Sequence, residues 1–257
     1  MRPLRPLTRW LAVALVCVAV GASAAWLALW ARYDVNRTCP ETPLVRSIVA
    51  AVLQRAGFLT FRSEICQDRW IVLEVYPGLR KGFFVDLGSA DGVANSNTKV
   101  LEDLGWDGIC VDPFPTNMSG RRCTLFTVPV DSVSGKRVRF RKAGTLGGID
   151  ALLGRGKVAT QGAQVVELET RTVTELLAQA KAPPFIHYMS IDIEGAELEA
   201  LKGLDFSRYR IGALTVEHNF EEPKRSDIRK LLEQNGYRWA RSVEQDDFYL
   251  GQVDLSQ

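Results

Sequence analysis

The sequence predicts an α/β fold, namely a doubly wound, mostly parallel sheet with an antiparallel C-terminal edge. From residue 81 onward, short apolar runs alternate with segments of helical periodicity, as expected for parallel strands joined by crossover helices. Several of the apolar runs end at an acidic residue, which is typical of strands that lead into a binding edge. The last two strand-like stretches follow one another without an intervening helix, which indicates an antiparallel pair.

The stretch 81–92 organises the rest of the chain, because it combines a buried strand, a tight turn and the approach to a helix. Gly88 and Gly92 bracket the turn, and Gly88 would let a ligand approach the backbone because it has no Cβ. Asp86 and Asp91 would put negative charge beside that ligand. Such a loop suits a cationic or hydroxyl-rich ligand better than a pyrophosphate, and it is closer to an S-adenosylmethionine loop than to a dinucleotide fingerprint.

The N-terminal part predicts a membrane anchor. Residues 11–31 are 21 residues without a charge, preceded by three arginines, and they are long enough to span a hydrocarbon core. A cleaved signal peptide with a site at 22–24 is the alternative, but the apolar run continues past that site to Trp30. We therefore expect a basic tail and anchor at 1–31, a linker and capping segment at 32–80, and the main domain at 81–257.

The orientation of this predicted single-pass protein is nearly balanced, because arginines flank the span on both sides. The very short basic tail favours a lumenal or extracytoplasmic domain. Sequons at Asn36 and Asn117 agree with that orientation.

The elements follow from periodicity and turn residues. An amphipathic helix begins at Leu44 and ends near Gly57. We expect strands at 70–76, 83–86, 108–112, 125–130, 137–141, 185–193, 211–217, 237–242 and 247–250. We expect helices at 93–104, at 172–180, from 194 onward and at 225–235. The Gly-, Lys- and Arg-rich stretch 134–164 is expected to be a long mobile insertion that covers an active site.

Composition limits the partners. The net charge is only +2, and no basic patch with interleaved aromatic residues is present, which argues against nucleic-acid binding. The five cysteines form no Cys-x-x-Cys pair and the chain has two histidines, which argues against a zinc site. Cys17 lies in the apolar run. The other four, Cys39, Cys66, Cys110 and Cys123, could form two disulfides or stay as thiols, and both interpretations remain open.

Polar side chains follow the predicted strands at their carboxyl ends. These are Asp86 with Asp91, Asp112, Asp192 with Glu194, and Glu217 with His218 and Asn219. Ligands of open α/β sheets bind beyond the carboxyl ends of the strands, so we expect these groups to converge on one crevice. Taken singly, each could instead cap a turn or favour a helix N-terminus.

The motifs resemble the FkbM-type methyltransferases over roughly residues 67–250. The similarity is carried by Phe83–Gly92, Gly105–Pro113, Ser190–Glu197, Thr215–Asn219, Gly236-Tyr237 and Asp247. Where the family more often has Glu-Pro, this chain has Asp112-Pro113. The resemblance implies a Rossmann-like fold of the class I methyltransferase type and S-adenosylmethionine-dependent methyl transfer, usually to a hydroxyl.

The resemblance also implies roles for individual residues. Asp86, Gly88, Asp91 and Gly92 would form the cofactor loop, Asp112 would hold the ribose, Asp131 could approach the adenine, and Asp192 would lie beside the cofactor. We nominate His218 as general base, assisted or oriented by Asp192 and Glu217. No metal site is assigned. A second mechanism would use Asp192, Glu194, Glu217 and Asn219 as oxygen ligands of Mg²⁺ or Ca²⁺.

Two other functions compete with methyl transfer. A catalytically inactive, membrane-anchored binding or trafficking adaptor could keep the fold, but it would have no physical need for Asp86, Gly88, Asp112 and Asp192 together. A nicotinamide oxidoreductase is excluded by the missing Gly-x-Gly-x-x-Gly. The acceptor is expected to be a small-molecule, glycan or lipid hydroxyl, held by loops such as 134–164.

Overall fold

The computed structural model describes residues 44–154 and 156–251 and divides the chain into two units, 1–60 and 61–257. In the first unit, the helix expected from Leu44 is confirmed as α2 (Leu44–Arg55). The predicted anchor at 11–31 lies outside the described residues. Within the described ranges, no helix is both long enough and apolar enough to cross a membrane.

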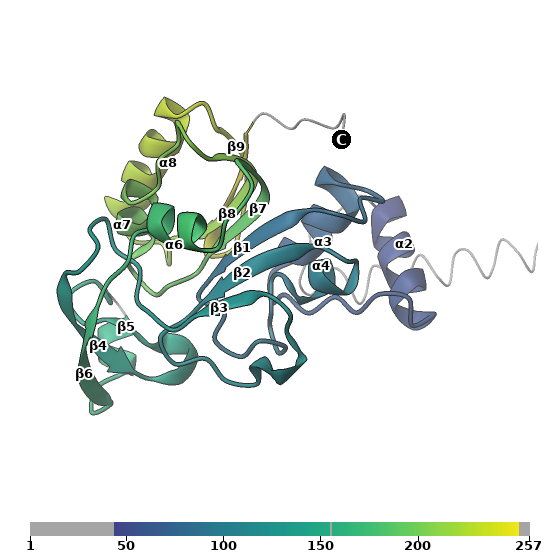
Figure 1. Ribbon diagram of the computed structural model, residues 1–257. Coiled ribbons are helices and arrows are strands. Elements are labelled where there is room, and N and C mark those ends of the chain that lie inside the picture. Colours follow the sequence, from purple (N-terminus) through teal and green to yellow (C-terminus); the bar gives the residue numbers. More distant parts are fainter. Residues whose placement is uncertain (1–43, 155, 252–257) are drawn as a thin grey trace, which may run out of the picture. The chain divides into compact units, whose positions relative to one another are not determined.

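The second unit is built on a seven-stranded mixed sheet in the order β3-β2-β1-β7-β8-β10-β9 (Figure 1). Its strands are β1 (Phe83–Leu87), β2 (Asp107–Val111), β3 (Thr124–Phe126), β7 (Phe185–Ile191), β8 (Arg210–Glu217), β9 (Arg238–Val243) and β10 (Asp246–Leu250). The pairs from β3 to β8 are parallel, and β10 is antiparallel to both of its neighbours. This is the mostly parallel sheet that the sequence predicts.

The closing strand pair forms the antiparallel edge of the sheet, as the sequence predicts, but the order of its two strands was not predicted. β10 lies between β8 and β9, so β9 forms the edge. The C-terminal pair does form a hairpin, but its second strand inserts against β8 and its first strand is left outside.

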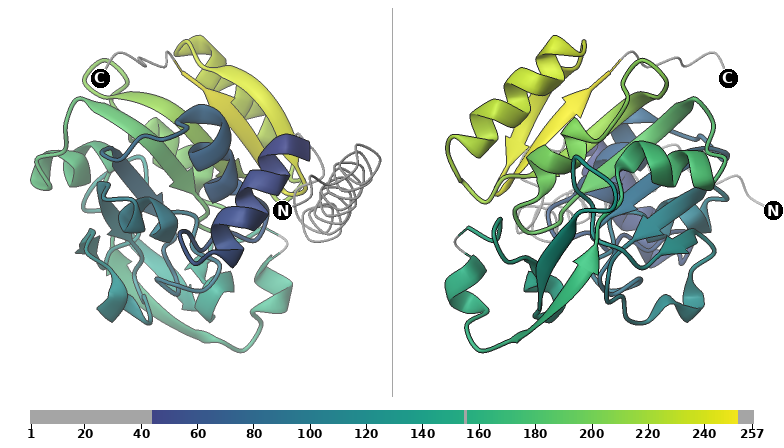
Figure 2. Two further views of the ribbon diagram at one scale, coloured as in Figure 1. Left: turned by 90° about the vertical axis from the view of Figure 1, so that its right-hand side faces the viewer. Right: turned by 60° about the vertical axis from the view of Figure 1, so that its left-hand side comes forward.

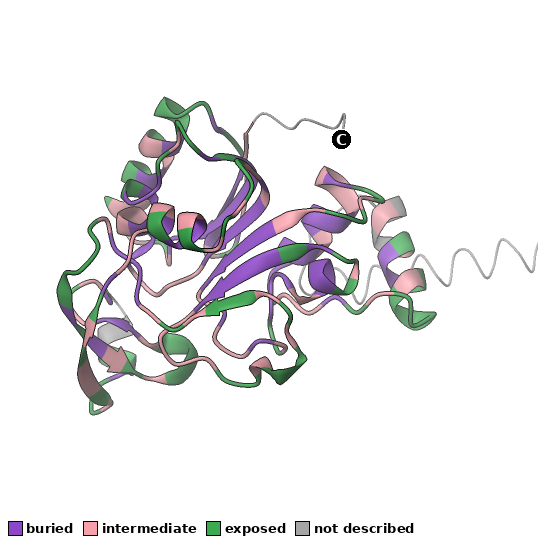
Figure 3. Cartoon of the chain, in the orientation of Figure 1, coloured by how far each residue is buried: buried purple, intermediate pink, exposed green. Residues whose placement is uncertain are grey.

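Helices cover both faces of the sheet. α3 (Gln67–Trp70) and α4 (Lys99–Asp103) lie on one face, and α6 (Val173–Gln179), α7 (Glu197–Lys202) and α8 (Lys224–Gln234) lie on the other (Figure 1). The largest cluster of buried apolar side chains joins β1, β2, β7 and β8 to α6, α7 and α8. The central strands are buried along nearly their whole length (Figure 3).

The expected strand at 70–76 is wrong, because this segment is helical. α3 continues directly into a π-helical turn, Ile71–Val75, and the Tyr76 N–H donates to the Ile71 carbonyl at 2.9 Å. Trp70 packs edge-on against Phe248 of β10, with ring centroids 4.9 Å apart. A short apolar run without alternation is compatible with a buried strand or a buried helix, and here packing against the sheet decides for the helix.

Two other elements are shorter than expected. α4 covers 99–103 instead of 93–104, because the side chains of Asp91 and Ser96 accept hydrogen bonds from backbone N–H groups in the preceding segment. Such side-chain bonds compete with helical ones. β3 covers 124–126 instead of 125–130, and only an isolated bridge from Val130 to Arg171 continues its direction.

The stretch 134–164 is ordered structure, where a mobile insertion was expected. It contains β4 (Arg137–Lys142), β5 (Gly148–Ile149) and the short helix α5 (Gly156–Ala159), and β6 (Gln164–Glu169) follows. These strands form a separate antiparallel sheet in the order β5-β4-β6 (Figures 1 and 2). The strand at 137–141 is confirmed as β4. β6 and the sheet itself were not predicted.

Candidate functional site

Two cavities adjoin where β1 and β7 end. The first cavity, of about 590 Å³, is lined by the loop after β1 and by residues that follow β7 and β8. The second cavity, of about 330 Å³, lies beyond β2 and borders the small sheet. Residues that line both are Gly88, Ala90, Thr145, Asp192 and Glu194. A single elongated ligand can therefore occupy both cavities and pass between them at the ends of β1 and β7.

The sheet register brings the acidic strand ends together. Leu87 pairs with Ile191, and Ile191 pairs with Val216, so the residues that follow β1, β7 and β8 emerge at one edge. Asp192 and Glu217 thus lie on neighbouring strands at the same level. The predicted convergence of Asp86, Asp192 and Glu217 on one crevice is confirmed, since all three line the first cavity.

Asp86 is held in place by the side chains of Thr98 and Arg121. Its Oδ2 accepts a hydrogen bond from Thr98 Oγ1 at 2.5 Å, and Arg121 Nη1 lies 3.8 Å away. Burial raises the pKa of Asp86, and the Arg121 charge opposes that rise. Arg121 also donates to the Gly92 carbonyl, to Thr98 Oγ1 and to Glu102 Oε1. This buried cation ties the glycine loop to α4 and was not identified from the sequence.

Gly88 is required for a reason other than the one expected. Its φ is +90°, and a Cβ at this position would lie 1.7 Å from the Asp192 backbone oxygen. The glycine therefore allows the end of β7 to approach the end of β1, in addition to lining both cavities.

The other residues of the predicted cofactor loop, Asp91 and Gly92, mainly stabilise the conformation and packing of the loop. Asp91 lines the first cavity, and its Oδ1 accepts from the N–H groups of Val93 and Ala94 at 3.0 and 2.8 Å. These bonds lower the pKa of Asp91. Gly92 lines neither cavity, and a Cβ there would lie 2.5 Å from Met118 Sδ, so its role is close packing.

Asp112 lines the second cavity, as expected for a residue at the end of β2. Its Oδ2 accepts from the Ala90 N–H at 2.9 Å, and its Oδ1 accepts from the Phe114 N–H at 2.7 Å. Burial raises its pKa, and these two bonds oppose the rise. A carboxylate oxygen can accept more than one hydrogen bond, so Asp112 retains capacity for ligand hydroxyls.

The Asp-Ile-Glu-Gly-Ala-Glu motif divides its carboxylates between two tasks. Glu197 is buried and closes the turn, because its Oε1 accepts from the Gly195 N–H at 2.8 Å and its Oε2 accepts from Lys224 Nζ at 2.8 Å. Glu194 adopts a left-handed conformation with a φ of 53°, which is uncommon for a residue with a Cβ. Whereas Glu197 closes the turn, Asp192 and Glu194 line both cavities.

Asp192, Glu194 and Glu217 form a compact carboxylate cluster. One oxygen from each lies within 4.8 Å of the other two. Burial is the main cause that raises the pKa of all three groups, and the charges of the neighbouring carboxylates add to it. The pKa of Glu194 rises to about 7. Such a cluster can accept a proton near neutral pH or bind a cation.

The structure does not bring His218 into either cavity. Its Nδ1 accepts from the Phe220 N–H at 3.0 Å, and its buried Nε2 lies 3.7 Å from Asp247 Oδ1. Burial lowers the pKa of His218 to about 4, against the opposing effect of Asp247. His218 and Glu217 point in opposite directions because successive residues of a strand alternate between faces. The nominated general base therefore faces β10 and away from the cavities.

Asp131 is also placed away from both cavities. Its Oδ2 accepts from Lys136 Nζ at 2.8 Å, and its Oδ1 accepts from the Ser132 N–H at 2.6 Å. Burial alone would raise the pKa of Asp131, but the bonds from Lys136 and Ser132 outweigh it and hold the pKa below its usual value. The expected approach to an adenine is replaced by this ion pair. The apolar lining of the second cavity comes from other residues, which include Val130, Phe114 and Phe140.

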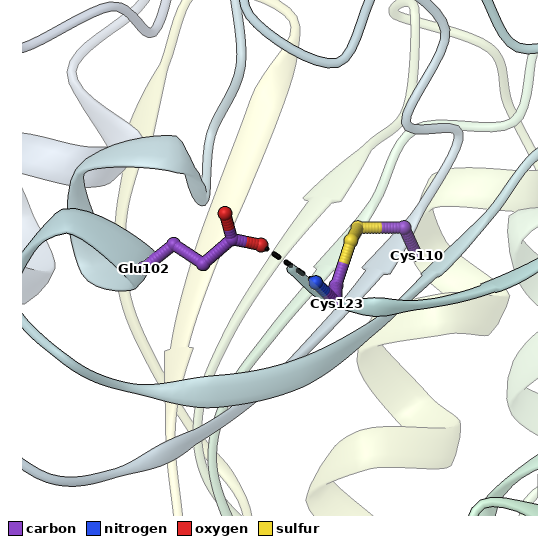
Figure 4. Close-up of side chains that lie close together, drawn as sticks. All are labelled: Glu102, Cys110 and Cys123. Atoms are coloured by element: carbon purple, nitrogen blue, oxygen red, sulfur yellow. Dashed lines mark hydrogen bonds between the residues drawn. A yellow bond between two sulfur atoms is a disulfide. The ribbon is translucent and has the colours of Figure 1, made fainter. Parts of the chain in front are cut away.

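A second group with metal-ligand residue types is not a metal site. Glu102, Cys110 and Cys123 lie close together, but the two cysteines form a disulfide, and Glu102 accepts from the Cys123 N–H at 2.9 Å (Figure 4). Metal binding by cysteine requires the thiolate. Cys66 is also disulfide-bonded, so disulfides rather than thiols are the state of these three residues.

The charge of the first cavity limits what it can bind. Among the described residues that line it, seven are Asp or Glu and none is Lys, Arg or His. The second cavity is more apolar and carries Asp112 at the end of β2. Together they suit a ligand with a cationic end and an apolar, hydroxyl-bearing end.

Comparison with known proteins gives a family match and a similar solved structure. The model of the methyltransferase FkbM domain family matches residues 86–239, more than half of the chain. Among solved structures, Methyltransferase FkbM from Methylobacillus flagellatus KT is similar at 14% sequence identity with a TM-score of 0.44, over 80% of this chain and 52% of that one. The chain thus spans about half the length of that protein. No curated protein matches the chain.

Proposed function

The chain belongs to the methyltransferase FkbM family, and from that premise we propose that it transfers a methyl group from S-adenosylmethionine to a hydroxyl acceptor. The family makes the protein a methyltransferase. The observation that carries the rest of the proposal is the pair of adjoining cavities, of which one is acidic and the other is more apolar, with Asp112 at the end of β2.

The residues present fit S-adenosylmethionine. Its sulfonium and ammonium groups are cationic, and the first cavity offers carboxylates, including Asp86, with no basic side chain among its described lining. The adenosine part is apolar with two ribose hydroxyls, and the second cavity offers aromatic and aliphatic side chains together with Asp112. Gly88 and Asp192, which line both cavities, would lie beside the sulfonium.

When bound, S-adenosylmethionine supplies an electrophilic methyl group on a positively charged sulfur. An acceptor hydroxyl must lose its proton as its oxygen forms the new bond to carbon, so a proton acceptor is needed nearby. Asp192 and Glu194 are the carboxylates placed for this task, because both line the region shared by the two cavities. Glu217 lies beside them and takes the assisting role that the sequence assigns to it.

The test is a titration of the full-length chain with S-adenosylmethionine, comparing wild type with Asp112→Asn. Charge-assisted hydrogen bonds contribute about 1.5–3 kcal/mol each, so we expect affinity to fall by roughly tenfold to a hundredfold. Asp107→Asn is the matched control, since Asp107 is an exposed aspartate at the opposite end of the same strand. Its affinity should stay within about twofold of wild type.

Equal affinity of the Asp112 and Asp107 variants would contradict the ribose assignment. If wild type shows no saturable binding at all, the alternative of a catalytically inactive adaptor gains support. If wild type does bind the cofactor, turnover with small-molecule, glycan and lipid alcohols identifies the acceptor class. Turnover is measured as the S-adenosylhomocysteine released.

We also propose that the segment 11–31 anchors the enzyme in a membrane, with its domain on the lumenal or extracytoplasmic side. Supporting observations are the 21 uncharged residues and the disulfide Cys110–Cys123, since disulfides persist in oxidising compartments. The expected result is that the chain stays with membranes after alkaline extraction and resists external protease in sealed vesicles. Release by alkali would exclude the anchor, and digestion in intact vesicles would reverse the orientation.

A further inference from the structure

We propose that Asp192, Glu194 and Glu217 bind a hard divalent cation, Ca²⁺ or Mg²⁺, within the first cavity. These ions take oxygen ligands, and carboxylates are their usual protein ligands. The three side chains come from the end of β7, from the turn after it and from the end of β8. They therefore converge from two neighbouring strands of the rigid sheet, and the site is not confined to one mobile loop.

The spacing of the three oxygens fits a single ion. They lie within 4.8 Å of one another, which is the span that two oxygens reach across one Ca²⁺ at a bond length of about 2.4 Å. Mg²⁺ has bonds of about 2.0–2.1 Å, so two of its ligands can be at most about 4.2 Å apart. Three oxygens spread to this limit would have to draw slightly closer around Ca²⁺ and further around Mg²⁺, so the spacing favours the larger ion.

Glu217 gives an independent indication of a ligand. Its side chain is 6% exposed, lines the first cavity and shares a hydrogen bond with Asp192, but its buried Oε2 has no hydrogen-bond partner among the described residues. Buried carboxylate oxygens are normally satisfied, and an unpartnered one in a residue that lines a cavity points to a missing cation or donor.

The surrounding charges do not neutralise the cluster. In the part of the chain that the structure describes, none of its three members forms an ion pair. The nearby Lys224 bonds instead to Glu197 and Glu221, at 2.8 and 3.4 Å. Asp246, another buried carboxyl that lines the cavity, accepts from Gln67 Nε2 at 2.9 Å. Charge balance at the cluster therefore requires either bound protons or a bound cation.

The role of the ion in catalysis rests on the proposed function. A cation at the cluster would have coordination positions that face the first cavity, and an acceptor hydroxyl bound there would lose its proton more readily. That proton would pass to a carboxylate oxygen that the cation leaves free. This role would compensate for the position of His218, which faces away from the cavity.

The test is calorimetric titration of the chelator-treated, full-length protein with CaCl₂ and with MgCl₂, without S-adenosylmethionine or acceptor. We expect one ion per chain, with a dissociation constant between about 1 µM and 1 mM. Because bound protons must leave, the measured heat should change between buffers of different ionisation enthalpy. Glu217→Gln should weaken binding at least tenfold while keeping the size of the side chain.

Glu64→Gln is the matched control, since Glu64 is an exposed acid that lines the same cavity outside the cluster. It removes the same charge and should change affinity by no more than about twofold. Glu194→Gln, at a half-exposed position, replaces Glu217→Gln if the latter fails to fold by circular dichroism. Absence of saturable binding of both ions, or equal weakening by the Glu64 and cluster variants, would overturn the site. Because no cofactor is present, this outcome is distinguishable from failure of the proposed methyl transfer.

Discussion

Glu217, His218 and Asn219 are consecutive, yet only the first and third reach the first cavity. Glu217 is the last residue of β8, so the alternation of side chains along a strand turns the next one away, and Asn219 returns to the cavity only because the chain turns there, with a φ of 48°. Once Asp192 and Glu217 were assigned to one crevice, this alternation could have excluded His218. An imidazole is chemically suited to base catalysis, but the direction of the strand decides which side chain reaches the cavity.

Arg121 illustrates what sequence reasoning misses at the scale of one residue. It bonds to residues on both sides of the glycine loop and lies 3.8 Å from Asp86, but it occurs in a loop after a 3₁₀ turn and belongs to no motif. Its partners come from the folded arrangement of the loop, and nothing in the spacing along the chain indicates them.

Asp247 leads to a prediction about pH. Its carboxylate accepts from Arg225 Nη2 at 2.9 Å and from Ser242 Oγ at 2.5 Å, and it lies beside His218. Burial alone would raise the pKa of Asp247, but Arg225 and Ser242 outweigh it and lower the pKa to about 2. The unfolded value is about 3.9, so the stabilisation is fully present above that pH and is lost as the pH falls towards 2.

We therefore expect Asp247→Asn to lower the free energy of unfolding by about 2 kcal/mol at pH 6. The difference from wild type should narrow between about pH 5 and pH 2. Guanidinium unfolding at a series of pH values measures it. If the difference in unfolding free energy stays constant over this pH range, the ion pair with Arg225 is not the cause of the lost stability.

At the scale of elements, the sequence identifies most strands because each is a short apolar run between turn residues. The sequence is less informative where polar side chains or tertiary contacts determine the type or the length of an element. The π-helical turn at 71–75 is as apolar as a strand, and α4 is shortened by side-chain hydrogen bonds that periodicity does not reveal. The second sheet was missed because β6 alternates only weakly between buried and exposed positions.

The junction of β1 with β7 gives the prediction for this scale. Gly88→Ala would place a Cβ 1.7 Å from the Asp192 backbone oxygen, at a φ of +90°. We expect the strand ends to separate, unfolding free energy to fall by more than about 3 kcal/mol and cofactor binding to be lost. Gly78→Ala is the control, because Gly78 has a φ of +83° but nothing within 4 Å of the added Cβ.

Gly78→Ala should lower the unfolding free energy by only about 1 kcal/mol. This is the part of the Gly88→Ala effect that comes from the backbone conformation alone. Urea unfolding and cofactor titration of both variants separate this part from the steric one. Equal destabilisation by the two substitutions would mean that the close approach of Asp192 has little energetic weight.

At the scale of the whole molecule, the alternation of strands and helices predicts a parallel sheet, because a helix between two strands carries the chain back to the end at which the first strand began. The order in which strands pair is less accessible. The position of β10 between β8 and β9 depends on its contacts with β8, such as Asp247 opposite Val216, and no local pattern encodes that choice. Cysteine pairing is hidden for the same reason, since it depends on which strands become neighbours.

The disulfide Cys110–Cys123 links β2 to the start of the segment that enters β3, and it closes a loop with a sequence separation of 13 residues. Closing a loop of this size removes chain entropy worth about 3 kcal/mol from the unfolded state. We expect the double variant Cys110→Ala and Cys123→Ala to lose about this much unfolding free energy under non-reducing conditions. Asp112 directly follows β2, so removal of the disulfide should weaken cofactor binding if it distorts that strand. Binding should be unchanged if the disulfide acts only on the unfolded chain. Urea unfolding together with the cofactor titration distinguishes these effects, and unchanged stability would show that the two thiols are not bonded in the native protein.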